Sequence, residues 1–218
     1  MSSDEKRLRI GGKVSQGERA VYRAALIVIG ALSLSLCACN KTPDSAAVPP
    51  ATKAAEPPVA ESPLAKAATR GDLVGIKDLL DGGASIGVTD ALGRTPLHMA
   101  AFYEHPKTVA LLIERGAEVD AKDRIGMTPL HAAVLVGGMD EVELLLDNKA
   151  DIKAVTDTGM SPLHLAAATG QPQLSKLLIE RGADPQSKDK EGRTPLFYAT
   201  RNQHPRTIAF FRQYATKE

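Results

Sequence analysis

Three histidines recur at a fixed spacing along the chain. His98, His131 and His164 stand 33 residues apart, each in the context Pro-Leu-His. An imidazole can ligate a transition metal or exchange a proton near neutral pH. Periodic histidines are therefore candidates for a metal site, if the fold brings successive copies close together.

The residues around each histidine repeat as well. "GRTPLHMAA" begins at Gly93, and closely similar stretches begin at Gly126, Gly159 and Gly192. A fixed period of this length is the signature of a repeat architecture. The hydroxyl residues that lead the copies, with the equivalent residue one period earlier, are Ser62, Thr95, Thr128, Ser161 and Thr194.

Each copy predicts a pair of helices. The hydroxyl residue can cap a helix, and proline follows at the first helical position, where no N–H is needed. A second helix follows, for example "TVALLIERG" from Thr108, with apolar residues three and four positions apart. Gly83, Gly116 and Gly182 can end this helix in a left-handed turn. Lys149 stands at the same place in the third copy, where we expect a strained turn.

Helix, turn, helix and extended finger, with T-P-L-H at a 33-residue period, resemble the ankyrin repeat family. The resemblance covers residues 62–218. It implies an all-α solenoid of five helix-turn-helix units with β-hairpin-like finger loops. It also implies that the motif histidines brace neighbouring repeats rather than hold a metal. The implied repeats start near residues 62, 95, 128, 161 and 194.

The implied end repeats depart from the motif. Ala65 and Phe197 replace the histidine in the first and last copies. We expect Phe210 and Phe211 to close the core at the last repeat, with Arg212 in solvent. Such departures are typical of capping repeats.

The resemblance also implies a binding surface, made of the finger tips and the residues seven and eight positions after each cap. These positions carry an apolar strip in the middle repeats with arginines beside it, a composition typical of protein interfaces. The alternative is that Phe102, Leu135 and Val136 pack against neighbouring helices, which leaves a smaller patch. The predicted partner-binding residues are Arg70, Leu92, Arg94, Phe102, Tyr103, Ile125, Met127, Leu135, Val136, Met160, Arg193 and Arg201.

The start of the chain predicts an export signal. Residues 1–23 are polar and basic, and an uncharged run, "AALIVIGALSLSLCAC", extends from Ala24 to Cys39. Its end, "LCAC", resembles the bacterial lipobox, which implies cleavage before Cys39 and attachment of lipid to it. Residues 1–38 are then a lipoprotein signal peptide. The alternative is an uncleaved signal anchor.

Residues 39–61 are the predicted lipidated cysteine and linker. The segment after Cys39 is rich in Ala and Pro and has no helical period. Extended at about 3.1 Å per residue, it reaches up to about 70 Å. Asn40, after the cysteine, favours the outer membrane. We therefore expect a lipid-anchored, periplasm-facing protein of the bacterial cell envelope.

Composition and motifs narrow the function classes. Residues 39–218 carry 21 Lys and Arg against 23 Asp and Glu, which gives no electrostatic case for nucleic acid. No H-E-x-x-H pair, P-loop or G-x-G-x-x-G appears. The sequence predicts no enzyme and no cofactor, but a monomeric domain that binds a protein or peptide partner. The alternatives are an accessory, chaperone-like scaffold for a periplasmic enzyme and an exported effector that binds host proteins.

Overall fold

The computed structural model describes residues 62–215, which belong to one compact unit. The predicted signal peptide, Cys39 and the predicted linker lie outside these residues. Within residues 62–215 the chain forms ten helices and no strand. The helices are α2 (Pro63–Arg70), α3 (Leu73–Asp81), α4 (Pro96–Phe102), α5 (Pro106–Glu114), α6 (Pro129–Val136), α7 (Met139–Asp147), α8 (Pro162–Ala168), α9 (Pro172–Glu180), α10 (Pro195–Arg201) and α11 (Pro205–Ala215).

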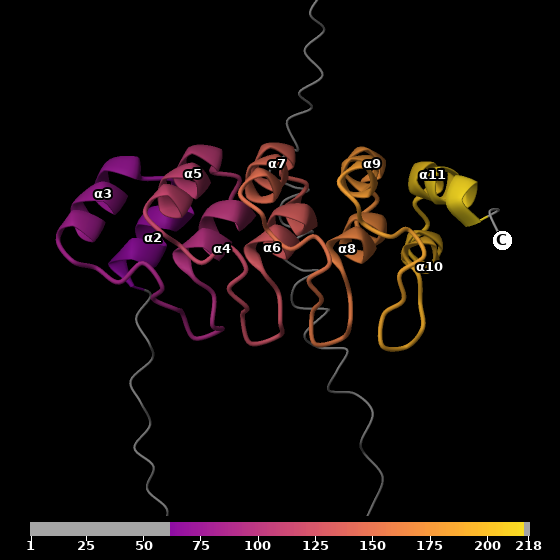
Figure 1. Cartoon of the computed structure of the whole chain (residues 1–218), viewed down its shortest axis with the longest axis horizontal. Coiled ribbons are helices and arrows are strands. Elements are labelled where there is room, and N and C mark those ends of the chain that lie inside the picture. The colour runs from indigo at the N-terminus through magenta and orange to yellow at the C-terminus, as the bar shows by residue number, and fades with distance from the viewer. Residues whose placement is uncertain (1–61, 216–218) are drawn as a thin grey trace, which may run out of the picture. The chain divides into compact units, whose positions relative to one another are not determined.

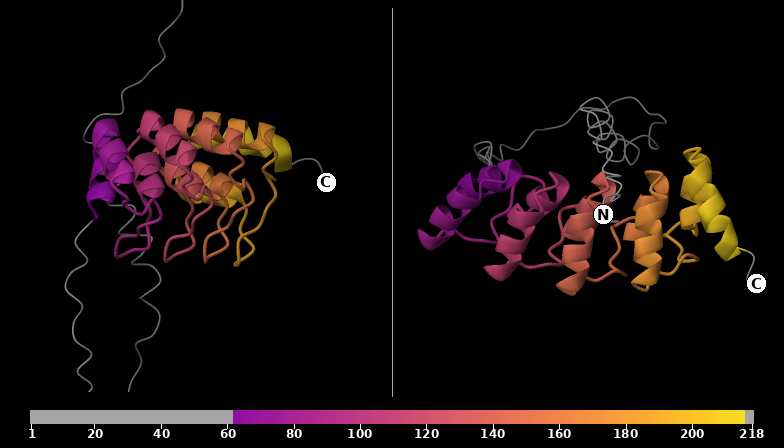
Figure 2. Two further views of the ribbon diagram at one scale, coloured as in Figure 1. Left: turned by 60° about the vertical axis from the view of Figure 1, so that its left-hand side comes forward. Right: turned by 90° about the horizontal axis from the view of Figure 1, so that it is seen from above.

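The helices are arranged in pairs that form two layers. The even-numbered helices stack side by side as an inner layer, and the odd-numbered helices form the outer layer (Figure 1). Each inner helix packs against its outer partner and the neighbouring inner helices. The loops between pairs, which we call fingers, extend together from the inner side of the stack (Figure 2). This all-α solenoid confirms the predicted fold class.

The inner helices begin where the sequence predicts them to begin. Ser62 Oγ accepts the Ala65 N–H at 3.1 Å, and Pro63 follows at the first helical position. Proline also follows Thr95, Thr128, Ser161 and Thr194 at the start of the later inner helices. Thr95, Thr128 and Ser161 form capping boxes there, whereas the Thr194 side chain makes no cap bond. These caps satisfy backbone donors that a helix start leaves free.

The inner layer is built from one large and several small side chains per helix. Leu97, Leu130 and Leu163 are at most 1% exposed, and burial of each contributes about 2 kcal/mol. The alanines that follow, such as Ala100 and Ala101, are fully buried. A methyl group at these positions lets neighbouring helices approach closely, so the stack has no room for larger residues there.

The motif histidines join each inner helix to the next finger. In His98, Nδ1 accepts the Thr95 N–H at 3.1 Å, so the proton lies on Nε2, which donates to the Met127 carbonyl at 3.0 Å. His131 and His164 repeat this arrangement with the carbonyls of Met160 and Arg193. The predicted bracing role is confirmed. The ring replaces the glutamate of an ordinary capping box and adds a bond to the neighbouring repeat.

The outer helices end in left-handed residues. Gly83, Gly116 and Gly182 have φ between 87° and 102°, as predicted. Lys149 takes the same conformation with φ 67°. A Cβ built at Gly116 or Gly182 meets no atom within 4 Å, so the cost at Lys149 is a backbone cost of about 1 kcal/mol.

The end of the stack follows the prediction for Phe211 and Arg212, whereas Phe210 is only half-buried. Phe211 is 1% exposed and lies edge to face with Phe210, at 5.3 Å between ring centroids. Arg212 is exposed. Phe197, which takes the place of the motif histidine, is 44% exposed. No finger follows Phe197 among the described residues, so its ring has nothing to brace.

The buried histidines predict acid sensitivity. Burial lowers the pKa of His131 to about 4, so the fold holds this ring neutral while the unfolded chain binds a proton near pH 6.5. The stability that His131 contributes is present above pH 6.5 and falls by about 3 kcal/mol as the pH drops to 4. His131→Gln should therefore flatten the pH dependence of the unfolding free energy, measured by urea titration, between pH 8 and 4.

A second variant tests the same effect by the same urea titrations. His98→Gln should flatten the curve in the same direction, because burial lowers the pKa of His98 as well. A His131→Gln curve parallel to the wild type would contradict the prediction.

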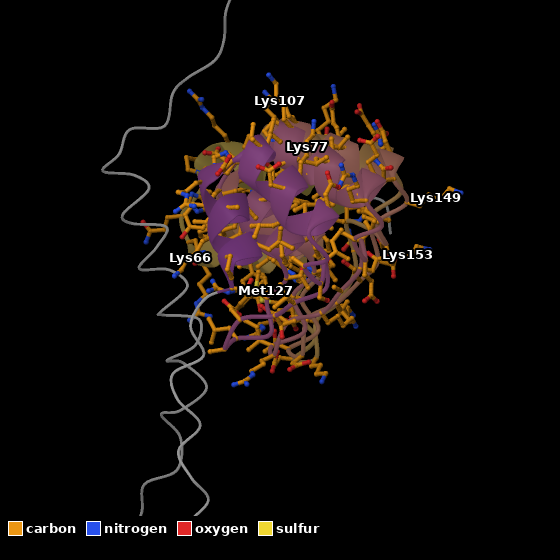
Figure 3. The ribbon with its side chains drawn as sticks, turned by 90° about the vertical axis from the view of Figure 1, so that its left-hand side faces the viewer. Lys66, Lys77, Lys107, Met127, Lys149 and Lys153 are labelled. Atoms are coloured by element: carbon orange, nitrogen blue, oxygen red, sulfur yellow. The ribbon has the colours of Figure 1, made fainter. Side chains whose placement is uncertain are left out.

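Relief of the left-handed lysine should stabilise the stack. We expect Lys149→Gly to raise the free energy of unfolding by about 1 kcal/mol, measured by urea denaturation. Lys153→Gly is the matched control, because Lys153 is also an exposed lysine at the edge of the domain and has no positive φ (Figure 3). Lys153→Gly should leave stability unchanged or lower it, and equal gains from both variants would contradict the strain.

Candidate functional site

The finger tips expose two of the predicted partner-binding residues. Leu92 is 55% exposed and Ile125 is 45% exposed. Their conformation is set by the aspartate two residues earlier, since Asp90 Oδ1 accepts the N–H of Leu92 and of Arg94, each at 2.9 Å. Asp123 holds the next tip in the same way. With the backbone donors satisfied inside each tip, the side chain at its centre points outward.

Neighbouring tips are joined through their backbones. The Arg124 N–H donates to the Leu92 carbonyl at 2.9 Å, and the Asp157 N–H donates to the Ile125 carbonyl at 3.0 Å. The Lys190 N–H continues the series to Thr158 at 3.2 Å. The fingers therefore form one continuous edge, in which Leu92 and Ile125 lie on adjacent tips.

The ends of the inner helices supply a second row of apolar groups. Phe102 and Tyr103 meet edge to face, with ring centroids 5.2 Å apart, and both are half-buried. Val136, at the end of α6, and Met160, at the base of the third finger, are half-buried too. Together with Leu92 and Ile125 they form what we call the inner surface.

Two predicted surface residues belong to the core instead. Leu135 is 2% exposed and Met127 is 8% exposed, so the prediction that they reach a partner is wrong. The helix α6, "PLHAAVLV", lies between α4 and α8 and is apolar on every side. A helix that is apolar all round is a buried one, and this signal was available in the sequence. Met127 is held by its backbone, which binds both His98 and Asp123.

Two of the predicted arginines are held inside their own fingers. Arg94 Nε donates to Asp90 Oδ2 at 2.8 Å, and Arg193 Nε donates to Asp189 Oδ2 at the same distance. The Arg193 guanidinium also lies 5.2 Å from the centroid of the Tyr198 ring. Arg70 and Arg201, at opposite ends of the inner layer, are exposed. The structure thus leaves Arg70 and Arg201 as the predicted arginines that extend from the surface.

The last finger contains the most perturbed carboxyl group among the described residues. Burial alone raises the pKa of Asp189, but hydrogen bonds from the Tyr198 hydroxyl and from Arg193 outweigh it and lower the pKa to about 2. Burial and the same bond raise the pKa of Tyr198. The result is an ionised carboxylate beside a neutral phenol, which fixes the finger and offers no nucleophile.

One catalytic pattern was missed in the sequence. Gly83-Ala84-Ser85-Ile86-Gly87 matches G-x-S-x-G, the nucleophile elbow of hydrolases. An elbow needs a strand before the serine and a helix after it. Here Ser85 is exposed in an irregular loop after α3, and its carbonyl accepts the Val88 N–H. The local structure is a finger, not an elbow.

Residues 62–215 contain neither a candidate metal site nor a membrane-spanning helix. Between residues 62 and 215, no three His, Cys, Asp or Glu side chains are placed to hold a metal ion. The helices of this region are all too short to cross a bilayer. The three motif histidines use both ring nitrogens in hydrogen bonds within the protein.

Comparison with protein families agrees with this geometry. The family model described as "Ankyrin repeats (3 copies)" matches residues 64–156 and, in a second overlapping match, residues 132–217. No curated protein matches the chain. Ankyrin repeats generally mediate protein–protein interaction. The two matches together cover more than half of the sequence, and the chain belongs to the ankyrin repeat family.

Proposed function

We propose that this protein is a lipid-tethered ankyrin repeat protein that holds a protein or peptide partner on its inner surface, in the bacterial cell envelope. The observation that carries the proposal is the inner surface itself. Leu92 and Ile125 are about half exposed on tips that are bonded to each other, and Phe102 and Tyr103 stand on the adjacent inner helix. Exposed apolar groups gathered on one face are typical of interaction sites.

The partner that suits this surface has an apolar centre and acidic ends. The middle of the inner surface is aromatic and aliphatic, and the exposed Arg70 and Arg201 lie at the two ends of the inner layer. An apolar segment would displace water from the middle, and acidic groups would find the arginines. We infer an extended or helical segment that spans several repeats.

The proposed anchor rests on the sequence alone. A basic region, an uncharged run and "LCAC" before Asn40 support lipid attachment at Cys39. Several acyl chains, at about 0.8 kcal/mol per buried CH₂, would hold the protein stably on a membrane. The Ala- and Pro-rich residues 40–61 would then act as a spacer between the bilayer and the repeats.

Removal of the exposed side chains should abolish partner binding. We expect the triple variant Leu92→Ser, Tyr103→Ala, Ile125→Ser to capture at least about tenfold less partner. The three substitutions remove apolar area that the partner would bury. A photo-crosslinking residue placed at 92 or 125 in the intact cell, followed by mass spectrometry, should identify the same partner from both positions.

Val74 provides the matched control for that experiment. It is 69% exposed, on the outer helix α3. Val74→Ser should leave capture unchanged, and a crosslinker at 74 should not label the partner. Equal labelling from positions 74 and 125 would show that the inner surface is not the binding site.

Anchoring makes a separate prediction. Cys39→Ala should abolish metabolic labelling with palmitate and move the protein out of the membrane fraction, because the acylated thiol is lost. Cys37→Ala is the matched control and should keep both labelling and membrane association. Retention of label in Cys39→Ala would contradict the lipoprotein hypothesis and leave the binding surface untouched.

A further inference from the structure

The junction between the α4/α5 pair and the α6/α7 pair differs from the others. At two junctions a histidine at the start of the outer helix reaches the preceding pair: His105 Nε2 donates to the Thr69 carbonyl, and His204 Nε2 donates to the Ala168 carbonyl, each at 3.0 Å. Gln171 takes this place before α9. Before α7 the equivalent residue is Gly138, which has no side chain to offer.

The residue that faces each of these side chains depends on which side chain is present. A Cβ built at Gly71 would lie 2.9 Å from His105 Nδ1, and one built at Gly170 would lie 2.5 Å from His204 Nδ1. Only glycine fits beside a histidine there. Opposite Gly138 the chain has Glu104, which keeps the left-handed conformation with φ 58° but carries a side chain.

Glu141 occupies the space that Gly138 leaves. It lies in the first turn of α7 and is 3% exposed, and its Oε2 is 2.5 Å from a Cβ built at Gly138. The equivalent residues of α5, α9 and α11 are also buried but carry no charge. They are Thr108, Leu174 and Thr207. A carboxyl group has therefore replaced a neutral core residue, next to the glycine that stands in the histidine's place.

The charges around Glu141 oppose its ionisation. Burial raises its pKa, its own backbone N–H partly offsets this, and the negative charges of Glu104 and Asp140 raise it further. The helices packed against α7 offer little compensation. On α6 the one titratable group is His131, which bonds to the finger, and Lys107 and Glu114 of α5 are exposed. Lys176 and Glu180 of α9 pair with each other.

The same junction lacks a second contact. Asp81 of α3 pairs with Arg115 after α5 at 2.9 Å, and Asp147 of α7 pairs with Arg181 after α9 at 2.8 Å. Between α5 and α7 the place of the arginine is taken by Asn148, whose side chain donates to Leu144 of its own helix. The two neighbouring junctions of the outer layer therefore each have this ion pair. The junction between α5 and α7 lacks it.

We propose that this junction is an acid-strengthened joint in the stack, in which protonation of Glu141 tightens the packing of α7 on α5 and ionisation loosens it. The sign follows from the raised pKa. The stabilising contribution is complete below the ordinary value of 4.5 and is lost as the pH rises through the folded pKa. This is opposite to the histidines, which weaken the fold in acid.

The joint has a consequence for binding that rests on the proposed function. Phe102 and Tyr103 end α4 on one side of the joint, and Val136 ends α6 on the other. A change in packing between the two pairs would change the spacing of these apolar groups. The joint itself is tested without a partner, so its failure and that of the binding proposal are distinguishable.

Hydrogen exchange resolved by mass spectrometry tests the joint on the full chain. Protection factors, corrected for the intrinsic exchange rate at each pH, are compared between peptides that cover α7 and peptides that cover α9. Because histidine protonation affects the whole stack, the ratio of α7 to α9 protection isolates the joint. We expect this ratio to rise in the wild type as the pH is lowered from 7 to 4.5, the ordinary value below which the stabilising contribution is complete.

Three variants decide the outcome. Glu141→Gln should raise the ratio at pH 7 and remove its pH dependence, and Glu141→Thr, which takes the residue of α5 and α11, should do the same if the glutamine variant folds poorly. Glu143→Gln, at an exposed carboxyl of the same helix that is not among the charges acting on Glu141, should keep the pH dependence. A wild-type ratio that does not change between pH 7 and 4.5, or a pH dependence that survives Glu141→Gln or Glu141→Thr, would overturn the proposal.

Discussion

The stack depends on a neutral imidazole between each of the three middle inner helices, α4, α6 and α8, and the finger that follows it. One ring nitrogen accepts from the cap residue of its own helix, and the other donates to a carbonyl of the next repeat. A protonated ring would lose the first bond, because it has no acceptor nitrogen. In these three repeats the ring completes the cap and holds the next finger, so the repeats are kept in register by a buried polar contact as well as by apolar packing.

In a stack of this kind, a departure from the repeat motif affects only the contacts next to it. Each pair contacts only its neighbours, so a departure from the motif in one pair changes two junctions and no others. The α6/α7 pair concentrates three departures: Gly138, the buried Glu141 and the left-handed Lys149. The junctions on either side keep the outer-layer ion pairs Asp81–Arg115 and Asp147–Arg181.

The sequence predicted most of the fold, because helix caps, left-handed turns and tight aspartate turns depend on a few neighbouring residues. The burial of surface candidates was harder to predict. Seven residues after the cap, Arg201 is exposed, whereas Leu135 is buried, since α6 has a neighbour on both sides. The role of Glu141 depends on Gly138 and Glu104, which meet only in the folded stack. Cys39 and the export signal lie outside the described residues.

The bonds between successive tips also bear on how a ligand would be recognised. Arg124, Asp157 and Lys190 each donate to the tip before them, so the fingers are fixed relative to one another before anything arrives. A ligand that touches several of them pays little entropy to order them, and its dissociation requires all contacts to break nearly together. The linked fingers would therefore slow the dissociation of a ligand more than they would speed its association. Slow dissociation suits a protein that retains its ligand.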